Sequence, residues 1–143
     1  FLSAVENAED DEAAGATAAL DLNIGMDDVL IGLTASGRTP FTVGTIKAAT
    51  DAGALTIGIA NNPETPILAA ATCPILLATG GEIIAGSTRL TAGTSQKICL
   101  NLISNMIMIR MGYVVEGMMV AMVPTNEKLR QRRQKIEALL GRG

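Results

Sequence analysis

Three apolar runs of five or six residues recur along the first part of the chain, with little alternation between apolar and polar side chains. They are residues 29–33, 55–60 and 73–78. Such runs are typical of strands that are buried on both faces of a parallel sheet. Segments with helical spacing precede and separate them, at residues 4–20, 41–52 and 66–71. Strands that alternate with helices in this way predict an α/β fold with right-handed crossovers.

A different pattern fills the last third of the chain. Residues 91–111 predict a long helix, and from residue 98 onward it is apolar on nearly every face. A helix of that kind has to be covered on all sides, so we expect a second subunit to pack against it and form a homodimer. Nearby methionines fit adaptable core and interface packing better than a metal or cofactor site. Residues 127–140 predict a final helix whose basic side chains form a solvated face.

The three expected strands leave the first edge of the sheet unpaired. A free-standing domain normally pairs or covers such an edge. We therefore expect the chain to form the later part of a larger parallel sheet. Its 143 residues, 48% of them hydrophobic, suffice for one domain with a core.

Composition excludes several classes of function. The net charge of −3 and the scarcity of aromatic residues argue against a nucleic-acid partner. Cys73 and Cys99 stand in apolar runs, and the chain has no histidine, so we expect buried free thiols, no metal site and no cofactor. The acidic N-terminal segment does not fit a signal peptide, and no run is long enough to span a membrane. These features predict a cytoplasmic protein that makes no membrane contact.

The segment from Thr34 to Pro40 carries the first candidate chemistry. It reads Thr-Ala-Ser-Gly-Arg-Thr-Pro and joins the first apolar run to the next helical segment. A helix N-terminus after a strand offers unpaired backbone N–H groups and the positive end of a helix dipole, which together stabilise an anion. A phosphate site is one interpretation. The alternative is an ordinary turn with Ser36 or Thr39 as N-cap and Pro40 in the first helical turn.

Four segments in order along the chain resemble the N-acetylmuramic acid 6-phosphate etherases, a family with the sugar isomerase (SIS) fold. They are Ala8-Glu9-Asp10, residues 35–40, residues 86–97 and residues 125–129. The resemblance runs from about residue 5 to residue 129. Its specificity comes from the order and spacing of the four segments.

The resemblance implies a three-layer α/β/α sandwich that binds a phosphosugar and works as a homodimer. It implies a carbon–oxygen lyase of cell-wall recycling, which converts N-acetylmuramic acid 6-phosphate into N-acetylglucosamine 6-phosphate and D-lactate. By the same resemblance, a glutamate at the position of Glu9 removes the proton at sugar C2 and lactate leaves from C3. Water then adds back.

Further site residues follow from the resemblance and from position in the sheet. The family's phosphate loop maps onto Ser36, Gly37, Arg38 and Thr39, and Thr34 stands two residues before Ser36. Glu82 follows the third apolar run, at the edge where ligands bind in open α/β sheets. Ser87, Thr88 and Arg89 read either as a cap at a helix start or as sugar and phosphate contacts. These positions complete the expected substrate site.

The chain also departs from the family. We expect residues 1–143 to form one SIS domain that lacks the family's first βα unit, and with it the first phosphate loop and the second catalytic glutamate. Thr91 stands where the family usually has lysine.

Alternatives therefore stay open. Glu9 is either the catalytic base or a solvated acid at an exposed helix start. Glu82 is either a substrate contact or an ordinary loop glutamate. The whole chain reads either as the lyase or as a non-catalytic regulatory module that binds a phosphosugar.

Overall fold

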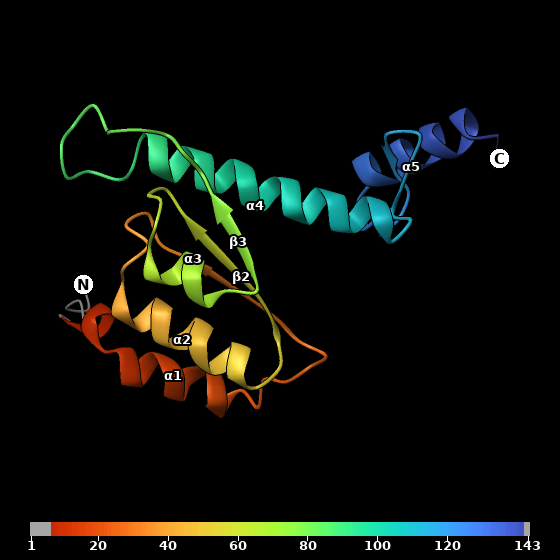
Figure 1. Ribbon diagram of the computed structural model, residues 1–143. Helices are drawn as coiled ribbons and strands as arrows, with labels where there is room; N and C mark the ends of the chain where they lie inside the picture. The colour runs from red at the N-terminus through yellow and green to blue at the C-terminus, as the bar shows by residue number, and fades with distance from the viewer. Residues whose placement is uncertain (1–6, 142–143) are drawn as a thin grey trace. The chain divides into compact units, whose positions relative to one another are not determined.

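The computed structural model describes residues 7–141 (Figure 1). Its elements are η1 (Ala8–Asp10), α1 (Glu12–Asp21), β1 (Val29–Leu33), α2 (Pro40–Asp51), β2 (Leu55–Ala60), α3 (Pro66–Ala70), β3 (Cys73–Leu76), α4 (Thr91–Arg110), β4 (Val114–Val115), β5 (Met118–Met119) and α5 (Glu127–Leu139). The chain divides into two compact units, Phe1–Lys97 and Ile98–Gly143. The first unit holds the larger sheet, and the second holds a short hairpin and α5.

The larger sheet is parallel, with strand order β1-β2-β3. This confirms the α/β fold and all three predicted strands. The third strand ends at Leu76, two residues earlier than expected, although the Leu77 N–H still donates to the Ala60 carbonyl at 2.8 Å. The Thr79 N–H then donates to the Leu77 carbonyl at 2.8 Å, and this tight turn takes the chain out of the sheet. Within residues 7–141, β1 pairs with β2 alone, as the sequence predicted for the first edge.

Two helices, α2 and α3, cover one face of this sheet, and α1 packs against α2. Figure 1 shows α1, α2 and α3 on the same side of β2 and β3, with α3 and α2 nearer to the strands. The core lies between these helices and the sheet, and its buried members are Val43, Ile46, Ala60, Ile67 and Ala71. Because strand side chains alternate between faces, the same pattern leaves Val29, Ile31 and Leu55 exposed on the opposite face.

That opposite face corrects two expectations from the sequence. Burial on both faces is confined to the end of β2, residues 58–60, since the burial of β1 alternates and β3 is largely exposed. Cys73 pairs with Ile57 on the exposed face, so its thiol is exposed, and Cys99 is half-buried. The apolar character of a run did not reveal which of its faces the helices cover.

The first predicted helix, residues 4–20, is also interrupted. Residues 4–6 lie outside the described part of the chain, and residues 8–10 form the 3₁₀ turn η1. Asp11 then adopts an extended conformation, and its side chain accepts a hydrogen bond from the Ala14 N–H at 2.9 Å. Asp11 is thus the N-cap of α1, and a cap residue cannot lie inside the helix that it begins. The other predicted helices begin and end within one residue of the observed bounds.

The second unit contains the later part of α4, the antiparallel hairpin β4–β5 and α5. The hairpin turns through Glu116 and Gly117, both with positive φ angles, of 50° and 75°. Its two strands of two residues each were not predicted, because so short a pairing leaves no periodic pattern. Asn126 caps α5 by accepting from the Leu129 N–H at 2.9 Å, which fixes the start of that helix.

Candidate functional site

The loop between β1 and α2 is a compact turn built around Gly37. The Gly37 N–H donates to the Thr34 carbonyl at 3.1 Å, and Gly37 has a φ of 70°. A side chain on residue 37 would collide with that of Thr65, which is 2% exposed. Glycine therefore suits this position for two reasons, the left-handed backbone and the close approach of Thr65.

Three hydroxyl groups meet inside this loop. The Thr34 hydroxyl oxygen lies 2.8 Å from that of Thr39 and 3.2 Å from that of Ser36. The Ser36 oxygen also accepts a hydrogen bond from the Arg38 N–H at 3.2 Å. Thr34, which is 8% exposed, forms the buried side of the cluster, and Ser36 forms its exposed side. Hydroxyls both donate and accept, so this cluster suits an oxygen-rich ligand.

The N-terminus of α2 adjoins the hydroxyl cluster. Thr39 is the N-cap residue and Pro40 lies in the first turn, as expected, but the Thr39 hydroxyl caps no helical N–H group. It is turned instead toward Thr34. The first turn of α2 therefore keeps its positive dipole end available to an anion, and the exposed Arg38 adds a full positive charge beside it.

Glu9 lies in the same hollow as this loop, although it is 25 residues away from Thr34 in the sequence. A cavity of about 410 Å³ is lined by Ala8, Glu9, Leu33, Thr34, Thr39, Phe41 and Thr42. Its walls combine one carboxylate, several hydroxyls and an aromatic ring. Glu9 is exposed, so the hollow brings a solvent-accessible carboxylate near these hydroxyl groups.

Close packing of α1 against α2 holds Glu9 at this position. Gly15 of α1 and Gly44 of α2 lie where any added side chain would collide with the backbone of the other helix. The Thr45 hydroxyl donates to the Gly15 carbonyl at 3.1 Å. At the surface, Lys47 pairs with Glu12 at 2.7 Å. The 3₁₀ turn that carries Glu9 directly precedes α1, so this packing fixes where the turn meets α2.

Glu82 is placed differently. Its two carboxylate oxygens accept hydrogen bonds from the N–H groups of Ala92, at 2.9 Å, and Thr91, at 3.0 Å. These backbone bonds, from Ala92 first and then Thr91, hold the pKa of the Glu82 carboxyl below its ordinary value of 4.5. Glu82 thus caps the start of α4, and it does not line the cavity that contains Glu9. Its expected substrate contact stays a prediction.

Ser87 and Thr88 also lie near the start of α4. The Ser87 N–H donates to the Ile84 carbonyl at 3.0 Å, and the Thr88 carbonyl accepts from the Gly93 N–H at 2.9 Å. The backbone of Thr88 therefore helps to begin the helix. Neither residue lines the cavity with Glu9. Their roles as sugar contacts stay predictions.

The sequence did not reveal a set of contacts made by the segment after β2. Asn61 is buried, and its side-chain nitrogen lies 3.1 Å from the Leu77 carbonyl oxygen and 3.0 Å from the Ser95 hydroxyl. Its side-chain oxygen accepts from Gln96 at 2.8 Å. Asn61 and Asn62 both donate to the Ala35 carbonyl of the candidate loop. The only signal in the sequence is the Asn-Asn-Pro turn, which predicts a bend but no partner.

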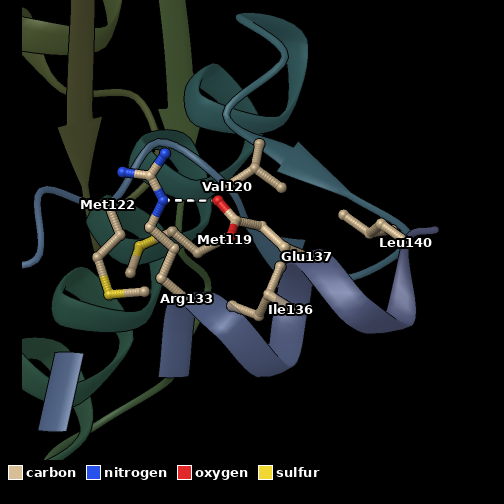
Figure 2. A pocket seen from close by; sticks show the side chains of 7 residues that line it. All are labelled: Met119, Val120, Met122, Arg133, Ile136, Glu137 and Leu140. Carbon is tan, nitrogen blue, oxygen red and sulfur yellow. Dashed lines mark hydrogen bonds and ion pairs between the residues drawn. The ribbon is translucent and has the colours of Figure 1, made fainter. Parts of the chain in front are cut away.

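A separate cavity lies within the second unit and contains none of the predicted site residues. It has a volume of about 190 Å³ and is lined by Met119, Val120, Met122, Arg133, Ile136, Glu137 and Leu140. Figure 2 shows Arg133 turned toward Glu137, with which it forms an ion pair at 2.7 Å. Two methionines on the wall agree with the expected packing role of these side chains. The ion pair engages both charged side chains that line the cavity.

Across residues 7–141, each helix is too short or too polar to cross a lipid bilayer.

Residues 6–111 match the SIS domain family. The chain is 54% identical over 133 residues to the N-acetylmuramic acid 6-phosphate etherase of Deinococcus radiodurans, covering 93% of this chain and 44% of that protein. It is 48% identical over 136 residues to the enzyme of the same name from Shouchella clausii, with 95% and 46% covered. The chain thus spans less than half the length of these curated relatives. The resemblance seen in the sequence is confirmed.

Among solved structures, the Vibrio vulnificus NanR protein complexed with ManNAc-6P matches with a TM-score of 0.51 and 12% identity. The match covers 91% of this chain and 42% of that chain. This likeness supports the fold.

Proposed function

This chain belongs to the SIS domain family, and from that premise we propose that it binds a phosphosugar in the cavity between Glu9 and the loop of Thr34 to Thr39. We propose further that the protein is a carbon–oxygen lyase acting on N-acetylmuramic acid 6-phosphate. The names of its relatives support this substrate. The observation that carries the proposal is the shared cavity, because Glu9 lines it together with Thr34 and Thr39 of the proposed phosphate loop.

The phosphate is assigned to the loop end of the cavity. Thr34 and Thr39 line the cavity with their hydroxyl groups, the Ser36 hydroxyl lies beside that of Thr34, and the first turn of α2 offers its dipole. Arg38 contributes a charge-assisted contact from the rim. A ligand anchored there by its phosphate directs its sugar carbons toward Glu9, which lines the same cavity.

In the proposed reaction Glu9 acts as a general base. Its carboxylate removes the proton at sugar C2, which is acidified by the neighbouring open-chain aldehyde. The C2–H electrons form a carbon–carbon double bond, and lactate leaves from C3 with the electrons of its ether bond and is protonated. Water then adds across the double bond, with hydroxide to C3 and a proton to C2. The products are N-acetylglucosamine 6-phosphate and D-lactate.

A second candidate function is a regulatory module that binds the phosphosugar without chemistry. One observation favours it: within residues 7–141, Glu9 is the one carboxylate that lines the cavity. Glu82 is engaged through both oxygens at the start of α4, so it is unsuited to protonate the leaving lactate. The lyase requires an acid from elsewhere in the intact protein, whereas the binding module requires none.

Replacing Glu9 by glutamine tests the proposed chemistry. Glu9→Gln keeps the shape of the side chain but cannot accept the C2 proton, so lactate release should fall at least by the ~10²- to 10⁴-fold typical of a lost general base. Binding of N-acetylglucosamine 6-phosphate should survive. Deuterium incorporation at C2 from heavy water reports proton removal separately from lactate departure. Asp10→Asn, in the same turn, is the matched control and should keep both activities.

The possible outcomes separate the two functions. If Glu9→Gln incorporates deuterium at C2 at the wild-type rate, another residue is the base. An intact wild-type protein that binds the sugar phosphate, exchanges no deuterium and releases no lactate would establish the regulatory module.

We also propose that the protein forms a homodimer through the apolar part of α4. Large apolar side chains are exposed along this segment, including Leu102, Met106 and Ile109. A monomer rarely exposes so continuous an apolar surface. The cytoplasmic location expected from the sequence stays a prediction.

A further inference from the structure

We propose that Asn62 is a positioning residue for the phosphate loop, acting through the peptide bond between Ala35 and Ser36. The Asn62 side-chain amide donates to the Ala35 carbonyl at 2.9 Å, and the Asn61 backbone N–H donates to the same oxygen at 3.1 Å. The inference rests on the proposed phosphosugar binding at Ser36 to Thr39. It assigns a role in that binding to a residue outside the loop.

The geometry of the peptide bond explains how this contact acts on a ligand. In a trans peptide the carbonyl and the N–H point in opposite directions, and no peptide bond within residues 7–141 is cis. Two donors that hold the Ala35 carbonyl toward the Asn61-Asn62 segment therefore turn the Ser36 N–H away from it. The Ser36 N–H donates to no protein atom within residues 7–141. It is the backbone donor that Asn62 keeps directed outward.

The same segment holds the far side of the loop. The Gly37 carbonyl accepts a hydrogen bond from the Ile67 N–H at 3.2 Å, and the buried Thr65 side chain packs against Gly37. Residues 61–67 thus fix the peptide before Ser36 and the peptide after Gly37. The two fixed peptides leave the loop little freedom to turn its donors inward when no ligand is bound.

Among residues 61–67, which hold the loop, Asn62 is the one that can be substituted without disturbing the core. Thr65 and Ile67 are buried, and Asn61 contacts the loop through its backbone, which substitution does not remove. Asn62 is exposed, and its one hydrogen bond in the described part of the chain is the one to Ala35. An exposed residue of this kind has little effect on stability, so an effect on binding would stand out.

The test compares ligand binding with stability in the intact protein. Asn62→Ala should raise the Kd for N-acetylglucosamine 6-phosphate, measured by calorimetry, by about 3- to 10-fold, the effect of one neutral hydrogen bond. The melting temperature should change little. Asn62→Gln keeps the amide donor and should recover part of the affinity. Gln134→Ala removes an exposed amide side chain from α5 and is the control that should bind like wild type.

A spectroscopic readout separates positioning from a general structural role. In the wild-type protein, titration with the sugar phosphate should shift the Ser36 amide resonance, because that N–H gains an acceptor. In Asn62→Ala the shift should shrink at saturating ligand. Equal affinity and an equal Ser36 shift in wild type and Asn62→Ala would overturn this inference and leave the proposed function intact. A wild-type protein that does not bind the sugar phosphate would overturn both.

Discussion

At the scale of single residues, Arg38 is the clearest test of where the phosphate binds. Arg38 is exposed, its backbone N–H donates to Ser36 of the hydroxyl cluster, and it stands two residues before the first residue of α2. A charge-assisted hydrogen bond contributes about 1.5 to 3 kcal/mol. Arg38→Ala should therefore weaken binding of N-acetylglucosamine 6-phosphate by about tenfold or more, as measured by calorimetry.

The matched control for Arg38 is Arg132→Ala, which removes an exposed arginine from α5 and preserves the loop. It should leave the affinity unchanged. The loss in Arg38→Ala should also shrink at high salt, because the contact is electrostatic and partly screened. Unchanged affinity in Arg38→Ala at low salt would place the phosphate elsewhere.

At the scale of elements, Glu82 makes the start of α4 dependent on pH. Its pKa is lowered in the folded protein by hydrogen bonds from Ala92 and Thr91, so its stabilising contribution is present above the ordinary carboxyl value of 4.5. That contribution is lost as the pH falls through the lower folded pKa. Hydrogen-exchange protection of the Thr91 and Ala92 amides should accordingly decline in that acidic range.

The carboxyl carbon resonance of Glu82 should titrate with a midpoint below 4.5, which measures the shift directly. Glu82→Gln supplies the comparison, since its amide keeps one acceptor and cannot ionise. Its protection at Thr91 and Ala92 should be lower near neutral pH and should no longer respond to acid. A Glu82 midpoint at or above 4.5 would contradict the capping role.

The elements also show how far the sequence could lead. Apolar runs located β1, β2 and β3, because a buried strand needs such a run whatever surrounds it. They could not show that one face of the sheet would be exposed, as at Ile31, because that depends on which helices pack there. The break at Asp11 was missed because an aspartate among other acids fits a cap and a first helical turn equally well.

The candidate site divides in the same way. The turn from Thr34 to Thr39 could be predicted from a strand, a glycine and Pro40. Glu9 was assigned through a resemblance, and no periodicity would have brought it to the same cavity as Thr34. The contact of Asn62 with Ala35 depends on the register of β1 and β2 and on the geometry of the following turn, neither of which the sequence expresses locally.

At the scale of the whole molecule, the proposed homodimer depends on the exposed apolar residues of α4. Met106 and Ile107 are 55% and 48% exposed, on adjacent faces of the helix. If these faces are buried against a second copy, Met106→Glu or Ile107→Glu would bury an unpaired charge, a change that disrupts interfaces. Each variant should yield monomer or aggregate in light scattering. Gln134→Glu, which adds the same charge to the exposed polar face of α5, should keep the wild-type mass. A monomeric wild type, or wild-type mass in both α4 variants, would contradict a dimer formed through α4.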